Sequence, residues 1–530
     1  MRKMLLDRSE TGIFSDQQLE LVLQGEKLAP FIENSFGRDS FGAQLASKSQ
    51  NYADEFRETL VEALFQQYGD LPMHSSVQEN LEALRSSSTF TVTTGHQMSL
   101  LTGPLYFIVK IAEVVQMSNQ LNESLEGKKV IPIFWMASED HDYEEIQSTN
   151  IFGKNLEVDY GQRGPVGRFD TTVLSELKEE VSGMFREEQL EEISQVLSSY
   201  HGESLANATR SLVNELFGDY GLVILDGDDP KLKARFQEIA KKELLEGFVE
   251  RSVHRTNKDL EQVGIKPQVF VRDINLFYIE NGIRERIQWK NDGYLIRGIG
   301  SFTQDRILKE LDENPERFSP NALIRPMYQE TILPNVCYVG GAGELNYWLQ
   351  LKTSFESIGL AFPLIKLRNS VMIIDGATMK KMDKIKADIK DVFKEQELWK
   401  KEYLAMNAQE DIDTSSLDNV VKTFKEELSI VLDLNSPYAQ SELRKMEKQL
   451  EGIKSKVVRE AKSKNEGAMK AIEAIKSRLF PDGGLQERQS NILSFCADGR
   501  VKMKIDQILQ SIDPFQSGLI VLMDDNKIKG

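Results

Sequence analysis

Three short stretches place imidazoles and carboxylates beside glycines, a combination that suits proton transfer on a small polar substrate. They are Gly95-His-Gln97, Ser138-Glu-Asp-His-Asp142 and Gly340-Gly-Ala-Gly-Glu344. Histidine and carboxylate side chains transfer protons, and glycines let backbone N–H groups approach an anion. We therefore expect the catalytic residues to be His96, Asp140 and His141. The residues expected to bind substrate or nucleotide are Gly95, Gln97, Glu139, Gly340, Gly341, Gly343 and Glu344.

The acidic stretch around His141 allows more than one interpretation. Glu139 or Asp140 can bind the amino group of an amino-acid substrate. Either histidine, His96 or His141, can serve as general acid or base. A helix cap is the alternative for Glu139 and Asp142. Metal binding is less favoured, because residues adjacent in sequence rarely all point inward. Since no Cys-x-x-Cys or His-x-x-x-His pair occurs, we expect no metal site.

Each of the three stretches follows residues that predict a buried strand. Apolar residues alternate with threonines in Thr89–Thr94, and Val130–Trp135 form an apolar run of strand length. Cys337–Val339 predict a third strand, and Gly103-Pro104 marks the start of a helix after the first. The first strand is expected to be interrupted at Gly95. If the three strands are neighbours in a parallel sheet, their turns meet in one pocket at its carboxyl edge.

Length and composition restrict the class of protein. The 530 residues predict about three domains of roughly 150 residues each. A net charge of −18 argues against a protein that holds nucleic acid through phosphate contacts, so we expect no nucleic-acid partner. The two cysteines, Cys337 and Cys496, indicate a reducing compartment. The first residues lack the apolar core of a signal peptide, and no apolar run is long enough to span a membrane. We therefore expect a cytoplasmic protein with no membrane partner.

Two further regions have sequence patterns that differ from those of the predicted parallel sheet. Between residues 268 and 297, four short strand signals alternate with hairpin-type turns such as Asn281-Gly282. They predict an antiparallel insertion that begins with a strand at 268–272. A single strand is expected over Leu364–Ile374. From about 377 to 478 the sequence is helical and charged, and apolar residues recur at steps of three and four, which favours a long antiparallel helical hairpin. These apolar residues include Leu443, Met446, Leu450, Ile453 and Val457.

The first stretch also carries a family resemblance. Thr94-Gly-His-Gln97, followed by Thr102-Gly-Pro-Leu-Tyr-Phe107, resembles the signature of BshC, the bacillithiol-synthesis cysteine ligase family. Further stretches that match this family, in its order, are Pro132–Asp142, Leu225–Pro230, Arg325–Glu330, Gly340–Glu344 and Leu479–Arg488. Together they run from the first third of the chain almost to its end.

This resemblance implies an α/β fold. The core would be a Rossmann-like parallel sheet resembling class I aminoacyl-tRNA synthetases, with an antiparallel insertion like a connective peptide and an α-helical coiled-coil arm. The expected division is 1–250 and 319–376 for the two parts of the core, 251–318 for the insertion and 377–480 for the arm. Residues 481–530 would form a C-terminal segment that returns to the core.

The likeness to synthetases extends to two catalytic signatures, each with departures. Only His96 matches the synthetase signature His-Ile-Gly-His, since Thr93 stands in place of its first histidine. Lys366-Leu-Arg-Asn-Ser370 is a candidate counterpart of Lys-Met-Ser-Lys-Ser, although the sequence around it predicts a strand rather than a loop.

The resemblance also implies a function. The chain would be a ligase that adds L-cysteine to glucosaminyl-malate, the last step in making the low-molecular-weight thiol bacillithiol. Amide formation needs an activated cysteine carboxyl, so ATP is the expected co-substrate. The coiled coil of the family mediates dimerisation, which predicts a homodimer joined through the arm. The alternative is a nucleotide-binding scaffold that organises enzymes of the thiol pathway through its coiled coil.

Overall fold

The chain divides into two compact units. The computed structural model describes residues 1–407 and 415–524. The first unit contains Met1–Ile373 and Gln486–Leu522, and it includes all the candidate site residues. The second unit contains Ile374–Leu485 together with the residues from Met523 onward.

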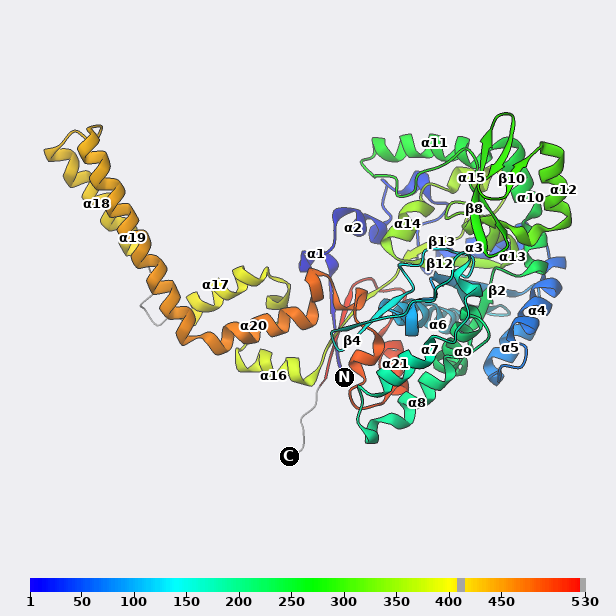
Figure 1. Cartoon of the computed structure of the whole chain (residues 1–530), viewed down its shortest axis with the longest axis horizontal. Coiled ribbons are helices and arrows are strands. Elements are labelled where there is room, and N and C mark those ends of the chain that lie inside the picture. Colours follow the sequence, from blue (N-terminus) through cyan, green and yellow to red (C-terminus); the bar gives the residue numbers. More distant parts are fainter. Residues whose placement is uncertain (408–414, 525–530) are drawn as a thin grey trace. The chain divides into compact units, whose positions relative to one another are not determined.

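A five-stranded parallel sheet forms the core of the first unit (Figure 1). All its neighbouring pairs run parallel. β2 lies between β12 and β3, so the three predicted strands are neighbours and end at one edge of the sheet. The predicted interruption at Gly95 is wrong, because β2 stays paired with β3 through Gly95 and His96. In spatial order the strands are β13 (Leu364–Leu367), β12 (Asn335–Gly340), β2 (Thr89–His96), β3 (Lys129–Met136) and β6 (Val223–Asp226).

Strand β2 is buried on both faces even though threonines alternate with its apolar residues. The hydroxyls of Thr91 and Thr93 both donate to Oδ1 of Asn335, at 3.3 and 2.8 Å. The Thr94 hydroxyl donates to the carbonyl oxygen of Val339 at 2.8 Å. A buried hydroxyl without a partner would cost about 1–3 kcal/mol, so these bonds allow threonine inside the sheet. They also tie β2 to β12 and so support the strand that carries His96.

The helix predicted after the first strand is confirmed. α6 (Tyr106–Ser124) begins just after Gly103-Pro104 and packs against β2 and β3. The other helices of the first unit are α1 (Arg8–Thr11), α2 (Asp16–Leu23), α3 (Ser40–Asn51), α4 (Glu55–Tyr68), α5 (Ser75–Ala83), α7 (Leu174–Ser182), α8 (Leu190–Ser199), α9 (Leu205–Phe217), α10 (Pro230–Glu246), α11 (Phe248–Gln262), α12 (Gln304–Glu313), α13 (Arg325–Ile332), α14 (Ala342–Trp348), α15 (Lys352–Ser357) and α21 (Val501–Ser511).

A second five-stranded sheet is antiparallel, as the hairpin signals predict. Asn281 and Gly282 both have positive φ, at 49° and 76°, which matches the turn type that their sequence favours. The predicted strand at 268–272 is wrong. The side-chain amide of Gln350 bonds the backbone of Gln268 and Val269, and so replaces a strand partner. In spatial order the strands are β10 (Gly300–Phe302), β9 (Gly293–Ile296), β8 (Ile283–Lys290), β7 (Leu276–Glu280) and β11 (Phe318–Pro320).

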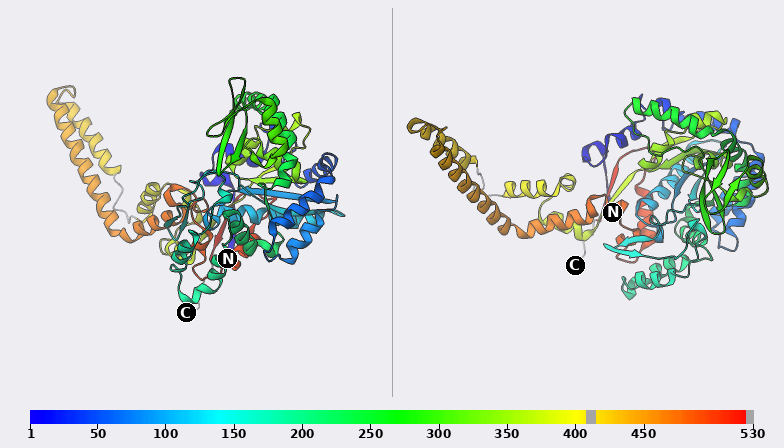
Figure 2. Two further views of the ribbon diagram at one scale, coloured as in Figure 1. Left: turned by 45° about the vertical axis from the view of Figure 1, so that its right-hand side comes forward. Right: turned by 45° about the horizontal axis from the view of Figure 1, so that its top comes forward.

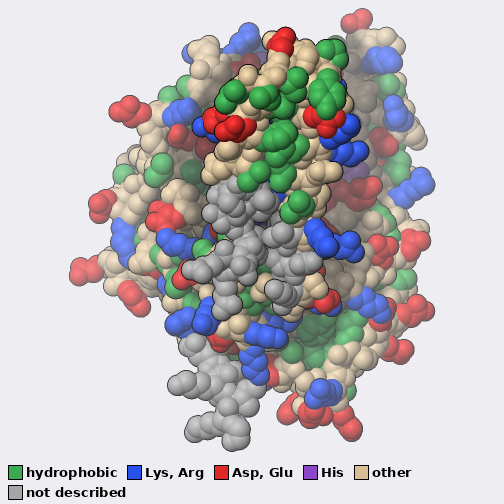
Figure 3. Space-filling view, turned by 90° about the vertical axis from the view of Figure 1, so that its left-hand side faces the viewer, with side chains coloured by type: hydrophobic (Ala, Val, Ile, Leu, Met, Phe, Trp, Pro, Cys, Tyr) green, Lys and Arg blue, Asp and Glu red, His purple; other side chains and the backbone are tan. Residues whose placement is uncertain are grey.

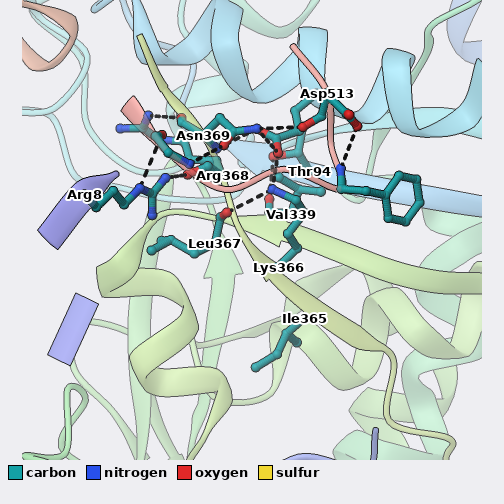
Figure 4. A network of polar contacts seen from close by, with 12 residues as sticks. Arg8, Thr94, Val339, Ile365, Lys366, Leu367, Arg368, Asn369 and Asp513 are labelled. Carbon is teal, nitrogen blue, oxygen red and sulfur yellow. Dashed lines mark hydrogen bonds and ion pairs between the residues drawn. The ribbon is translucent and has the colours of Figure 1, made fainter. Parts of the chain in front are cut away.

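The single strand predicted over 364–374 is wrong, because it breaks at Arg368-Asn369 into β13 and β14. β14 (Ser370–Ile374) joins a separate sheet with β15 (Leu519–Met523) and β1 (Arg2–Leu6). The guanidinium of Arg368 forms a two-pronged ion pair with Glu487 at 2.9 and 3.0 Å, and the backbone N–H of Asn369 donates to the buried carboxylate of Glu113. Figure 4 shows the polar network that holds this break. A short two-stranded sheet pairs β4 (Ser148–Ile151) with β5 (Lys154–Glu157).

The second unit is helical. Its helices α18 and α19 lie side by side (Figures 1 and 2), and Lys425 on α18 pairs with Glu447 on α19 at 2.8 Å. The predicted antiparallel hairpin is therefore confirmed for this pair. The side chain of Val457, one of the predicted seam residues, lies outside the described residues. The helices are α16 (Gly376–Lys384), α17 (Gln396–Asn407), α18 (Ser415–Val431), α19 (Pro437–Lys464) and α20 (Glu466–Leu479).

Candidate active site

A cavity of about 610 Å³ lies at the carboxyl edge of the parallel sheet. The ends of β2 and β3, residues of α14, and strands β7 and β8 all contribute to its lining. Its volume is in the range of small-molecule sites. The predicted site residues that line it are Gly95, His96, Gln97, Glu139, Asp140, His141 and Glu344. The structure therefore brings together residues that are almost 250 positions apart in sequence (Gly95 and Glu344).

The glycines at 340, 341 and 343 do not line the cavity. A Cβ at Gly340 would lie only 3.0 Å from the Leu345 side chain, so this glycine serves packing. The N–H of Gly341 donates to the Glu344 carboxylate at 2.8 Å, at the start of α14. Gly343 has open space around its Cα. The positions of these glycines therefore do not support the prediction that their backbone binds a phosphate.

His96 is a neutral imidazole with a fixed tautomer. Its Nδ1 lies 2.8 Å from the carbonyl oxygen of Gln97, and a carbonyl oxygen only accepts, so Nδ1 carries the proton and Nε2 keeps a lone pair. The ring packs against Tyr106 and Phe107, with centroids 5.1 Å apart in each case. Burial, followed by the nearby positive charge of Lys110, lowers the pKa of His96 to about 3. The residue thus suits hydrogen-bond acceptance from a substrate more than proton donation.

A buried ion pair lies next to His96. Nζ of Lys110 is 2.6 Å from Oε2 of Glu344, and it also donates to the carbonyl oxygen of Gly95. Burial raises the pKa of Glu344, but Lys110 and hydrogen bonds from Gly341 and Tyr338 outweigh it and lower the pKa below its ordinary value. Glu344 is therefore an anion that Lys110 compensates. Sequence analysis missed Lys110, although a lysine among the apolar residues of α6 was a usable signal.

Asp140 and His141 belong to one polar network with a residue of the insertion. Nε2 of Gln97 donates to Oδ2 of Asp140 at 2.6 Å. Nη1 of Arg284, on β8, donates to Nδ1 of His141 at 2.7 Å and lies 3.6 Å from Oδ1 of Asp140. Burial and the charge of Arg284 lower the pKa of His141, so its free ring nitrogen is the protonated Nε2. The sequence around Arg284 contains no signal that this arginine lies in the site.

Glu139 is held at the cavity wall by a buried lysine. Its carboxylate contacts Nζ of Lys233, which also donates to the carbonyl oxygen of Phe318 at 2.6 Å. Burial raises the pKa of Glu139, and Lys233 opposes that shift. The proposed helix cap is not found for Glu139 or Asp142, since the described chain has no helix between β3 and β4.

The stretch Lys366–Ser370 does not line the cavity. Lys366 is buried and forms an ion pair with the buried Glu113, while Arg368 pairs with Glu487. Both cations are therefore compensated within the protein. Their position gives no support to a role like that of the synthetase Lys-Met-Ser-Lys-Ser motif.

The described residues offer neither a metal site nor a membrane span. In the part of the chain that the structure describes, no three His, Cys, Asp or Glu side chains are grouped closely enough to hold a metal ion. Likewise, none of the described helices is long and apolar enough to cross a membrane.

Comparisons with known proteins agree with this architecture. The sequence model "Bacillithiol biosynthesis BshC, N-terminal Rossmann-like domain" matches residues 5–369, and "Bacillithiol biosynthesis BshC, C-terminal coiled-coil domain" matches residues 371–523. A solved structure from Campylobacter jejuni, described as "putative arginyl t-RNA synthetase", covers 83% of this chain and 98% of its own. It does so at 11% identity and a TM-score of 0.21, values that support no inference.

Three relatives carry the name "Putative cysteine ligase BshC". Those from Flavobacterium johnsoniae and Christiangramia forsetii are each 35% identical to this chain, of which they cover 97%, and the match spans 98% and 97% of their own lengths. The relative from Cytophaga hutchinsonii is 36% identical and covers 94% of this chain and 95% of its own. With both domain models matched in order and relatives of this similarity along nearly the whole length, the chain belongs to the BshC family of bacillithiol biosynthesis.

Proposed function

We propose that this chain is a ligase that joins the carboxyl group of L-cysteine to the amino group of glucosaminyl-malate, the last step of bacillithiol synthesis. Family membership and the names of the relatives support the assignment. At the level of residues, one observation supports the ligase function most directly. A neutral imidazole, carboxylates and arginines line one cavity at the carboxyl edge of a parallel sheet.

The reaction needs an activated cysteine carboxyl and a free amine. ATP is the proposed co-substrate: attack of the carboxylate on its α-phosphorus would give an adenylate and release pyrophosphate, and attack on its γ-phosphorus would give an acyl phosphate and release ADP. The amine nitrogen then attacks the carbonyl carbon and forms the amide bond, the carbon–oxygen bond to AMP or phosphate breaks, and the proton of the amine passes to solvent water. Nε2 of His96 has the lone pair to accept a hydrogen bond from that amine and orient it for attack. Asp140, fixed by Gln97 and Arg284, is suited to hold an ammonium group.

The arm is the proposed dimer interface, and the cytoplasm the proposed compartment. Hydrophobic side chains gather on the face shown in Figure 3. Among the residues of the hairpin, Ile430 is 76% and Ile453 49% exposed. An exposed apolar surface of this kind marks a partner surface, and a two-fold homodimer is its commonest use. Both cysteines, Cys337 and Cys496, are buried and free, which fits a reducing compartment.

Deletion of the gene, followed by measurement of low-molecular-weight thiols, tests the assignment. We expect bacillithiol to disappear and glucosaminyl-malate to accumulate. Complementation then separates the ligase from the scaffold alternative. A ligase requires the cavity, so His96→Gln should fail to restore the thiol, whereas a scaffold requires only the arm. Normal bacillithiol in the deletion strain would reject the proposed function, and full rescue by His96→Gln would favour the scaffold.

A further inference from the structure

Arg325 is a half-buried cation of the cavity lining without a carboxylate partner in the described chain, and its Nη2 is buried without a hydrogen-bond partner. It is the first residue of α13, and its guanidinium carbon lies 5.8 Å from the ring centroid of Trp135 and 5.5 Å from that of Tyr338. Nη1 donates to the neutral side-chain amide of Gln329 at 2.9 Å. None of the ion pairs within 4.0 Å that the described residues form includes Arg325.

The charges near Arg325 leave one positive charge uncompensated. Glu344, a carboxylate whose charge acts on Arg325, is already paired with Lys110 at 2.6 Å. His96, which also lies beside Lys110, contributes no charge because it is neutral at physiological pH. Among the described residues, the two cations Lys110 and Arg325 therefore have a single carboxylate, that of Glu344, to compensate them. A charge that is held away from bulk water without a partner is unfavourable, so an anionic ligand that pairs with it gains binding free energy.

Two of the three other arginines of the cavity lining, Arg284 and Arg272, differ clearly from Arg325. Arg284 donates to Ser319 and Pro320 as well as to His141, and it lies beside the carboxylate of Asp140. Arg272 is exposed and stacks on Phe270, so water screens its charge. Arg286 is half-buried like Arg325 and also forms no ion pair among the described residues. Among the arginines of the cavity lining, Arg325 is singled out by its Nη2, which is buried and has no hydrogen-bond partner within the described chain.

We propose that Arg325 binds a substrate carboxylate, either that of cysteine or one from the malyl group of glucosaminyl-malate. The identity of these two ligands rests on the proposed function. A guanidinium presents two parallel N–H donors to a planar carboxylate, and the aromatic rings of Trp135 and Tyr338 beside it restrict its orientation. The site would therefore both neutralise and orient a carboxylate inside the cavity that holds His96.

Calorimetric titration of the full chain tests this site without requiring turnover. The ligands are L-cysteine, glucosaminyl-malate and, as a third probe, inorganic phosphate. In Arg325→Met, the affinity for one of the two carboxylate substrates should fall at least about tenfold. The matched control Arg255→Met, at an exposed arginine of α11 outside the cavity lining, should stay within about twofold of the wild type. Whichever substrate loses affinity identifies the source of the carboxylate.

Several outcomes would overturn the proposal. They are wild-type affinity of Arg325→Met for both substrates, an effect on phosphate binding alone, and a wild type that binds neither substrate. If the wild type binds a carboxylate through Arg325 yet forms no amide, the carboxylate site stands and the proposed ligase function fails.

Thermal unfolding separates binding from a merely structural role. A binding residue predicts that Arg325→Met keeps the ligand-free midpoint, since an unpaired charge is removed, but loses the upward shift that the substrate causes. A structural residue predicts a lower ligand-free midpoint and an unchanged shift, which would contradict the proposal. If Arg325→Met does not fold, Arg325→Lys carries the test, because it keeps the charge and loses the two-pronged geometry. Unchanged substrate affinity in Arg325→Lys would then overturn the proposal.

Discussion

At the scale of single residues, burial determines the chemistry of His96. The hydrogen bond to the Gln97 carbonyl fixes which ring nitrogen carries the proton, while burial and Lys110 lower the pKa to about 3. The imidazole that lines the cavity is consequently neutral, with Nε2 available as an acceptor. Neighbouring polar groups are compensated in pairs, Lys110 with Glu344 and Lys233 with Glu139. The site can therefore hold many charges in one cavity and leave few of them free.

The low pKa of His96 predicts a specific loss of stability in acid. The unfolded chain binds a proton at this residue below about pH 6.5, whereas the folded chain does so only near pH 3. Between these values the unfolded state binds more protons, so stability falls as the pH falls. We expect the free energy of unfolding of the wild type to drop by up to ~1.4 kcal/mol per pH unit more than that of His96→Gln.

Urea unfolding at several pH values between 7 and about 5 measures this difference. His254→Gln is the matched control for the loss of a histidine side chain, because it replaces an exposed histidine on α11. Parallel curves for the wild type and His96→Gln would show that His96 is not buried as a neutral group.

At the scale of elements, a glycine-containing loop holds the segment that carries Glu139, Asp140 and His141. This segment is neither helix nor strand. The N–H of Gly167 donates to the carbonyl oxygen of Ser138 at 2.8 Å, and the N–H of Val166 donates to that of Asp140 at 2.7 Å. The two backbone bonds give an irregular segment a defined position at the end of β3.

Gly167→Ala should displace this segment. A Cβ at position 167 would lie 2.6 Å from Cβ of Ser138 and 2.8 Å from its carbonyl oxygen, closer than real atoms approach, so the backbone must move. A shift of about 1 Å in catalytic groups can cost about 100-fold in rate, and we expect a loss of about 10- to 100-fold in kcat/KM. Steady-state ligation kinetics measure it. Gly25→Ala is the control, since a Cβ there meets no atom within 4 Å. Equal rates for both variants would show that the loop does not position the site.

A structural feature could be predicted from the sequence where its cause lies in neighbouring residues, and could not where its cause lies in residues far along the chain. The residues before Gly95, Ser138 and Gly340 predicted three strands, because strand composition and burial leave a pattern along the chain itself. That the three strands are neighbours was a condition in the prediction, and the observed strand order meets it. The break at Arg368-Asn369 could not be predicted, since it depends on carboxylates supplied by Glu113 and Glu487.

The same limit applies to the candidate site. Seven of the residues proposed from their positions after strands line the cavity, whereas their roles stay predictions. Arg284 and Arg325 reach the cavity from β8 and α13, and only the folded chain reveals that they do. The glycines after β12 looked suited to an anion because sequence does not tell a packing glycine from one that faces a ligand.

At the scale of the whole molecule, the hairpin of α18 and α19 predicts self-association. Apolar side chains on this hairpin are exposed within its own unit, and a second copy could cover them. We expect the intact chain to be a dimer in solution, and the double variant Leu450→Glu, Ile453→Glu to be a monomer. Light scattering measures both masses. Lys448→Glu, on the same helix, is the control and should remain dimeric. A monomeric intact chain refutes the dimer, and a dimer that survives the double substitution places the interface elsewhere.

The central claim is that the cavity at the carboxyl edge of the sheet joins cysteine to glucosaminyl-malate. The most direct test is to incubate the purified chain with L-cysteine, glucosaminyl-malate and ATP and to follow the condensed thiol by mass spectrometry. The account predicts that the wild type forms this product and that His96→Gln lowers its rate by at least about 100-fold, while His254→Gln keeps the wild-type rate. No product from the wild type with all three substrates, or equal rates for the wild type and His96→Gln, would contradict it.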